Sequence, residues 1–312
     1  MPLIIFIILS VTLLMIICGG YVFFTACKRK PDLPWLDEEA MKKTHYKKYA
    51  HMIQQSHQWL QEHGAKDIWI VSEDGLKLHA YWVANPEAVG TILLAHGYKS
   101  TPLVDFGPAF AGYYAKGLNL LIPTQRSHGK SEGKYITFGV KESGDMLRWL
   151  SYHNETYGQI PMVLSGLSMG ASTVMYMLDE QLPENVKGVI VDCGFTSPRR
   201  IIGEVFRAVT HMPDRLFLWP CEWFARVFGG FSLSGKDSRK TLAKNKLPIM
   251  MAHGKDDGFV PCYMTEQGYE ICTGDKRLLL VAGADHGVSF LVEPEKYSQM
   301  IDGLLQQIGL LK

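Results

Sequence analysis

Residues 162–170 read MVLSGLSMG, and this stretch decides the fold. It opens with an apolar run, Met162–Leu164, of the length of a buried strand, and a helical pattern follows it. Gly166 and Gly170 stand two residues before and two residues after Ser168. A tight turn between strand and helix exposes a serine for attack, and it needs small neighbours because other backbone approaches closely. The stretch therefore predicts a nucleophilic serine at the end of a strand.

Short apolar runs alternate with helical stretches along most of the chain. The predicted strands are residues 91–95, 118–122, 162–164, 186–191, 249–252 and 278–281. The predicted helices are residues 103–116, 140–157, 169–181, 260–272 and 294–309. Two earlier segments, 68–71 and 76–83, flank a Glu-Asp-Gly turn and predict a hairpin. This α/β pattern predicts a mostly parallel central sheet with helices on both faces, and a site at the carboxyl ends of the strands.

Two later loops offer an acid and a base to the predicted nucleophile. Asp257 and His286 each follow a predicted strand, so both are expected at the same edge of the sheet as Ser168. His286 would take the proton from the serine, and Asp257 would orient the imidazole and stabilise its cation. Asp256 is a rival acid, and Asp285 is a third candidate whose contact with His286 is awkward because the two are adjacent.

A serine hydrolase also needs N–H donors for the oxyanion. We expect them to be the backbone groups of Met169, which follows the nucleophile, and of Tyr98, in the loop after the strand 91–95. His96 and His253 are expected to be buried, hydrogen-bonded histidines. Residues 126–131 are expected to form a structural turn beside the active edge, with substrate contact as the alternative.

Composition limits the partners that this chain could have. Of the net charge of +1, Lys28–Lys30 supply +3, so the remaining chain is about −2 and gives no reason to expect nucleic acid. The six cysteines show no CxxC spacing, and in a domain of this size we expect free thiols. We expect no metal and no cofactor, because the serine turn explains Asp257 and His286. The sequence carries no signal for the oligomeric state.

The N-terminal segment has the composition of a membrane span. Residues 1–27 contain no charged side chain, and residues 3–26 would form about 36 Å of helix, against a bilayer core of about 30 Å. This favours an uncleaved single-pass anchor in the lipid bilayer over a lipoprotein signal ending at Cys27 or a buried core helix. Lys28–Lys30 follow the span and place the remaining chain in the cytoplasm.

The domain organisation follows from these patterns. Residues 1–27 are the predicted transmembrane anchor, 28–65 a connector with a peripheral helix, and 66–312 the catalytic domain. Within that domain, residues 197–235 interrupt the alternation with many large apolar and aromatic side chains. They predict a small helical cap over the carboxyl edge, or a peripheral helical pair that completes the core.

Together these motifs resemble those of the α/β-hydrolases, especially membrane-anchored bacterial-type members of the serine aminopeptidase/esterase-like group. The resemblance covers about residues 66–310. The family pattern His-Gly-x-x-Asp-x-x-Val-Pro matches from His253 and implies that Asp257 is the acid, with Ser168 as nucleophile and His286 as base. Residues 125–127 depart from the Asp-x-Arg-Gly run of many members.

The expected activity is hydrolysis of a small carboxylic ester or other acyl substrate through an acyl-enzyme. A peptidase or amidase with the same triad is the alternative, since these motifs do not separate the two. A third interpretation is an inactive binding module tethered to the membrane, which the intact triad disfavours.

Overall fold

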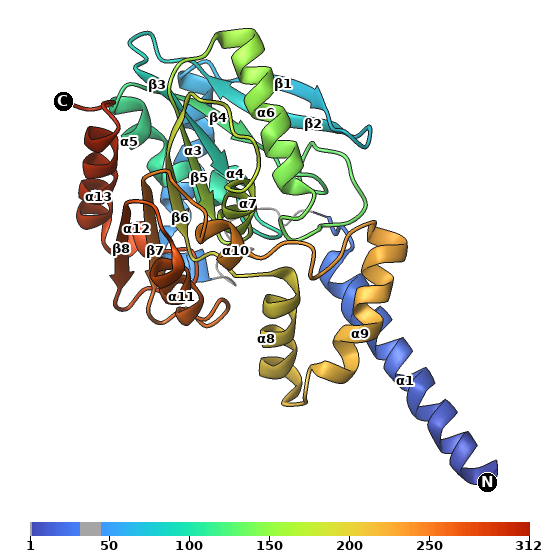
Figure 1. Cartoon of the computed structure of the whole chain (residues 1–312). Helices are drawn as coiled ribbons and strands as arrows, with labels where there is room; N and C mark the ends of the chain where they lie inside the picture. The colour runs from blue at the N-terminus through green and yellow to red at the C-terminus, as the bar shows by residue number, and fades with distance from the viewer. Residues whose placement is uncertain (1, 32–44) are drawn as a thin grey trace.

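An eight-stranded sheet forms the centre of the molecule (Figure 1), in a computed structural model that describes residues 2–31 and 45–312. Its order is β1-β2-β4-β3-β5-β6-β7-β8, and every pair is parallel except those made by β2. The bounds are β1 Lys66–Val71, β2 Lys77–Val83, β3 Gly90–Ala95, β4 Leu118–Pro123, β5 Met162–Leu167, β6 Val186–Asp192, β7 Ile249–Gly254 and β8 Lys276–Val281. The predicted hairpin and the mostly parallel sheet are confirmed.

Helices cover both faces of the sheet because its central strands are buried on both sides. Leu93 packs in one cluster with α6 (Glu142–Tyr157), α7 (Met169–Met177) and α10 (Ser238–Leu242). Its neighbour Ile92 points to the other face, towards α3 (Ala50–Glu62), α5 (Phe110–Ala115) and α13 (Pro294–Gln307). Two further helices, α11 (Tyr263–Ile271) and α12 (Ser289–Val292), follow β7 and β8.

The predicted helix over residues 103–116 is divided in the structure. It consists of α4 (Pro102–Asp105), the 3-10 turn η2 (Gly107–Ala109) and α5. Pro108 lies in the middle turn and has no backbone N–H, so it cannot donate the i to i−4 hydrogen bond that a continuous α-helix would need there. The proline therefore accounts for the break.

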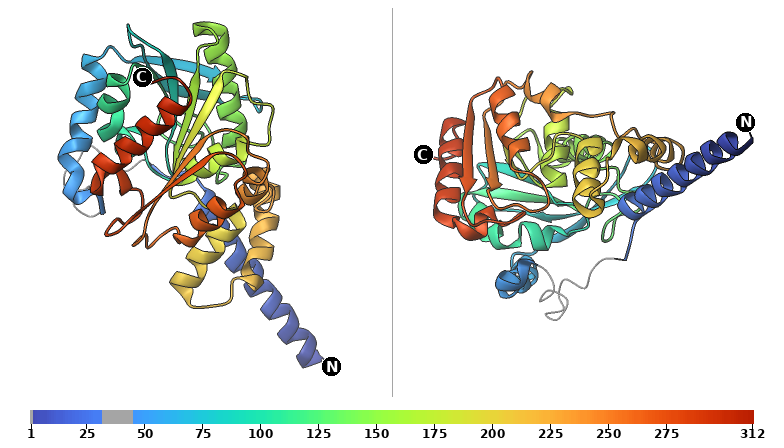
Figure 2. Two further views of the ribbon diagram at one scale, coloured as in Figure 1. Left: turned by 60° about the vertical axis from the view of Figure 1, so that its left-hand side comes forward. Right: turned by 90° about the horizontal axis from the view of Figure 1, so that it is seen from below.

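The N-terminal helix α1 (Pro2–Cys27) projects from the body (Figures 1 and 2). Its last third packs against α9 (Arg215–Phe224), and a Cβ added to Gly19 would lie 2.4 Å from the Cβ of Pro220. Phe23 and Cys27 are fully buried. The helix is thus exposed over its first part and part of the core over its last part, a division that its uniform composition does not reveal.

The region that the sequence predicted as a cap consists of α9 and two further segments. Helix α8 (Pro198–Thr210) forms a hairpin with α9, and a π-helical turn, η3 (Ala225–Gly229), follows (Figure 1). We call α8, α9 and η3 the cap. The expected connector falls partly on residues 32–44, which lie outside the described residues; beyond them come η1 (His45–Tyr49) and the amphipathic α3.

Candidate active site

Ser168 occupies a strained turn between β5 and α7. Its backbone has φ +56° and ψ −116°, a region that L-residues rarely adopt. A Cβ on Gly170 would lie 1.8 Å from the carbonyl oxygen of Ala95, and one on Gly166 would lie 2.3 Å from the carbonyl oxygen of Gly170. The two glycines are therefore required by close backbone approach, as the sequence pattern predicted.

The structure brings together the three side chains expected to form the triad. His286 follows β8, and its Nε2 lies 2.9 Å from Ser168 Oγ. Its Nδ1 lies 2.7 Å from Asp257 Oδ2, in the loop after β7. Because the carboxylate can only accept, Nδ1 carries the proton, and Nε2 is left as the acceptor of the serine hydroxyl proton.

The environment of Asp257 keeps its carboxylate ionised. The side chain has no exposed surface. Its Oδ1 accepts hydrogen bonds from the N–H groups of Phe259 and Val260, both at 2.8 Å. Burial by itself raises the pKa of Asp257, but hydrogen bonds from His253 and His286 outweigh it and hold the pKa well below its ordinary value.

The two rival acids, Asp256 and Asp285, accept hydrogen bonds from loop backbone groups instead of from the ring of His286. Asp256 is exposed, and its Oδ2 accepts from the N–H of Gly283 at 2.8 Å. Asp285 Oδ1 accepts from the N–H groups of Gly258, at 3.1 Å, and of its neighbour His286, at 2.7 Å. Both carboxylates thereby tie the acid loop to the base loop.

Of the two residues expected to bind an oxyanion, Met169 follows Ser168 directly, and Tyr98 lies in a loop that approaches Ser168 at Gly97. Met169 is the first residue of α7, so its N–H belongs to the helix end that has no intrahelical acceptor. The loop of Tyr98 passes close by, since a Cβ on Gly97 would lie 3.2 Å from the Cβ of Ser168. The Tyr98 side chain points away to α1, where its hydroxyl donates to the carbonyl of Ala26 at 2.7 Å.

Comparisons with known proteins agree on the fold. A scan against protein-family models gave no match. The Pyrococcus furiosus esterase Pf2001 superposes with a TM-score of 0.63 at 24% identity, covering 80% of this chain and 94% of that one. The chain has the α/β-hydrolase fold. Among curated proteins, the uncharacterized YqkD of Bacillus subtilis is 26% identical over 241 residues, 77% of this chain and 79% of that protein. The uncharacterized membrane protein YNL320W of Saccharomyces cerevisiae is 23% identical over 216 residues, 67% of this chain and 69% of that protein.

One buried acid at the active edge of this α/β-hydrolase fold was not found from the sequence. Asp105, in α4, accepts a hydrogen bond from the N–H of Gly97 at 2.6 Å and another from the hydroxyl of Ser100 at 2.6 Å. Burial raises its pKa to about 6. It holds the loop that carries Tyr98. No motif marks it, although its partners Gly97 and Ser100 lie only eight and five residues before it.

The remaining polar residues of the edge have structural partners. Arg126 donates to both carboxylate oxygens of Asp145 at 2.6 Å and to Asp74 at 2.8 and 3.1 Å. His96 Nε2 accepts from the N–H of the residue before Arg126, at 3.0 Å, and burial lowers the pKa of His96. His253 is likewise buried and bonded to Asp257. These contacts agree with the structural roles expected for them.

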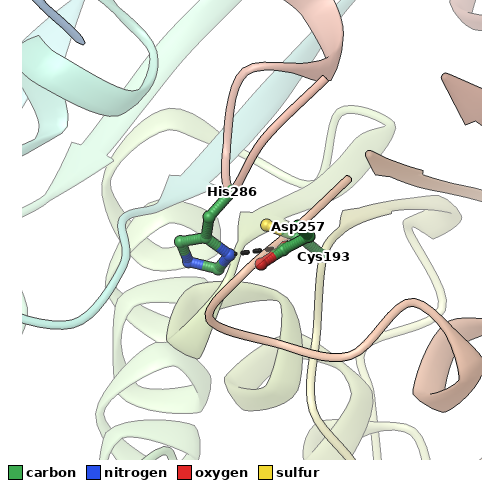
Figure 3. Close-up of side chains that lie close together, drawn as sticks. All are labelled: Cys193, Asp257 and His286. Carbon is green, nitrogen blue, oxygen red and sulfur yellow. Dashed lines mark hydrogen bonds and ion pairs between the residues drawn. The ribbon is translucent and has the colours of Figure 1, made fainter. Parts of the chain in front are cut away.

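Cys193 lies next to the acid and the base (Figure 3). Its sulfur, an oxygen of Asp257 and a nitrogen of His286 lie within 4.8 Å of one another, as metal ligands could. Burial, then Asp192 and Asp257, raise the pKa of the thiol well above its ordinary value, and only the thiolate is a good ligand or nucleophile. A metal would also have to replace the His286–Asp257 hydrogen bond, so these residues fit the acid–base arrangement better than a metal site.

An apolar pocket opens beside the site, between α1 and α8. Its volume is about 610 Å³, within the range of about 300–1,000 Å³ of ligand pockets. Tyr98 and Phe259 line its end nearest the site, and the ring of Phe259 lies 5.1 Å from that of His286, edge to face. The sequence anticipated apolar cap residues near the site but not that α1 forms a wall.

Proposed function

We propose that this chain is a membrane-bound serine hydrolase that cleaves carboxylic esters. The observation that carries the proposal is the hydrogen-bonded sequence from Asp257 through His286 to Ser168, at 2.7 and 2.9 Å. A neutral imidazole that accepts at Nε2 can take the hydroxyl proton as the serine attacks a carbonyl carbon. The strained turn at Ser168 and the free end of α7 support the same role.

The reaction would follow the acyl-enzyme route. Ser168 Oγ attacks the ester carbonyl, its proton passes to His286 Nε2, and the N–H groups of Met169 and Tyr98 stabilise the oxyanion. His286 returns the proton to the departing alcohol, which leaves an acyl group on the serine. Water then attacks that acyl group with His286 as base, and the carboxylic acid is released. Asp257 stays ionised throughout, as its lowered pKa requires.

The lining of the pocket favours an acyl group over the amino terminus of a peptide. An aminopeptidase needs a negative group near the substrate ammonium. The described residues that line this pocket include no Asp or Glu, and its one charged member is a lysine, Lys99. An apolar acyl chain meets no such mismatch, which makes the esterase the better-supported hydrolase.

Helix α1 would hold the enzyme in a membrane. It is the one helix in the described part of the chain that is long and apolar enough to cross a bilayer, and the yeast relative is named as a membrane protein. The basic residues Lys28, Arg29 and Lys30 directly follow the apolar run, so the positive-inside rule puts the catalytic domain in the cytoplasm.

Activity-based labelling tests the proposal with the full chain in detergent. A fluorophosphonate probe should label the wild-type protein, and Ser168→Ala should abolish both labelling and turnover of p-nitrophenyl acetate. Labelling that persists in Ser168→Ala would assign the nucleophile elsewhere. Aminoacyl anilides serve as the competing substrates, and efficient anilide cleavage without ester cleavage would make the protein a peptidase.

A further inference from the structure

We infer that the pocket between α1 and α8 binds one acyl chain of a membrane lipid ester, which enters from the bilayer along α1. This inference rests on the proposed esterase and names its substrate class. It makes α1 a wall of the substrate site as well as an anchor.

The pocket runs lengthwise along α1. The lining residues of this helix follow the spacing of one helical face: Ile17, Cys18, Tyr21, Val22, Thr25 and Ala26. At about 1.5 Å per residue they extend over roughly 13 Å. Ala26 lies at the catalytic end, since its carbonyl accepts the Tyr98 hydroxyl at 2.7 Å. Ile17 lies at the opposite end, where α1 leaves the body.

The opposite wall of the pocket is formed by α8, which also runs from the catalytic end of the pocket to its exposed end. Helix α8 begins beside the core, where Ile201 and Ile202 are buried. It ends at the hairpin tip, where Val209 is 74% exposed and Met212 is 48% exposed. All four line the pocket. The cavity therefore leads from Phe259, whose ring packs against that of His286, to a mouth lined by exposed apolar side chains.

That mouth opens onto a surface suited to lipid. Within the described residues, exposed apolar side chains continue from the projecting part of α1 to Tyr21, and then onto the cap, where Trp219 is 76% exposed and Trp223 is 54% exposed. Views from two directions show α9 beside α1 (Figures 1 and 2). Tryptophan and tyrosine gather at membrane interfaces, and an apolar patch of this kind marks a contact with membrane or protein. Because α1 itself has the composition of a span, the membrane is the occupant that the surface favours.

An acyl chain fits the chemistry of the interior. Polar side chains in the lining are few, and Lys99 lies at the catalytic end, where its Nζ donates to the carbonyl of Thr25 at 3.0 Å. Each methylene group transferred from water into such a pocket improves binding by roughly fourfold. A substrate with a long chain should therefore be preferred strongly to an acetate ester.

The chain-length preference of the full protein in detergent tests the inference. We expect kcat/KM for p-nitrophenyl dodecanoate to exceed that for the acetate by at least about 100-fold. Val22→Trp should lower this ratio at least tenfold, because the indole fills the pocket from the α1 wall. Leu13→Trp, on the exposed part of the same helix, is the matched control and should keep the wild-type ratio. Should Val22→Trp fail to fold, Val205→Trp fills the pocket from α8 and is read in the same way.

The outcomes separate this inference from the proposed function. Acetate hydrolysis with a ratio unchanged by both pocket substitutions would overturn the acyl pocket and leave the esterase standing. Absence of acetate hydrolysis and of fluorophosphonate labelling in the wild type would overturn the esterase itself.

A separate experiment tests whether the pocket mouth contacts the bilayer. The protein is placed in phosphatidylcholine vesicles that carry a doxyl label near the headgroup. The label should quench tryptophan fluorescence, and Trp219→Phe should remove part of that quenching. Trp69→Phe, on the edge strand β1, should remove none. Equal quenching in wild type and Trp219→Phe would overturn entry from the bilayer at the cap.

Discussion

Two regions meet at the pocket, and different forces hold them. The carboxyl edge of the sheet carries Ser168, Asp257 and His286 in loops that short hydrogen bonds and close backbone contacts fix. The α1–cap side is held by apolar fit, with Phe23 buried among cap side chains and Gly19 against Pro220. Hydrogen bonds demand particular atoms, whereas apolar packing accepts many side chains of suitable volume. Single-atom changes in the first region should therefore cause large losses of activity or stability. In the second region, large losses should follow only when side-chain volume is removed or added.

The largest effect is expected at the carboxyl edge of the sheet, where two neighbouring acids can each be changed to the amide. Asp257→Asn should lower kcat about 10⁴-fold, because the amide cannot stabilise the imidazolium and favours the wrong tautomer. Asp256→Asn should change kcat by less than about threefold, since the amide oxygen can still accept from Gly283. Turnover of p-nitrophenyl acetate measures both. Equal losses in the two variants would remove Asp257 from the role of acid.

The backbone contacts of the same region give the next largest effect. Gly170→Ala places a methyl group 1.8 Å from a carbonyl oxygen that cannot move away, so we expect a loss of at least about 4 kcal/mol in the free energy of unfolding. Gly112→Ala, in α5 with no heavy atom within 4 Å of the added Cβ, should gain about 0.5–1 kcal/mol. Thermal unfolding in detergent compares them, and a tolerated Gly170→Ala would contradict the tight turn.

On the apolar side, two truncations separate the projecting part of α1 from the part that packs in the core. Deleting residues 1–16 removes only the projecting part of α1 and should leave the melting temperature of the body unchanged. Deleting residues 1–27 also removes Phe23 and Cys27, both fully buried, and should cost at least about 3 kcal/mol. Differential scanning fluorimetry would show the difference. Equal melting temperatures would mean that the buried end of α1 does not stabilise the body.

Asp105 gives the smallest effect and depends on pH. Because burial raises its pKa to about 6, the folded chain binds this proton more tightly than the unfolded chain does. Stability from this group is therefore lost as pH rises from about 4 to about 6. Asp105→Asn does not titrate, so its stability relative to the wild type should rise by about 2–3 kcal/mol over that interval. Unfolding at pH 4 and pH 7 measures the change, and a difference independent of pH would show that Asp105 does not titrate there.

The sequence by itself determined the sheet, the serine turn and the loops of Asp257 and His286. Local chemistry is enough for these, because a parallel sheet places all its carboxyl ends at one edge and a tight turn needs glycine at fixed spacing. The sequence did not predict contacts that form only when the chain folds, whether within one loop or between distant segments. The contacts of Asp105 with Gly97 and of Gly19 with Pro220 have no periodicity or motif. Only the tertiary structure decided that the end of a uniformly apolar helix is core and its beginning is not, since apolar composition is the same for a side chain that faces lipid and one that faces protein.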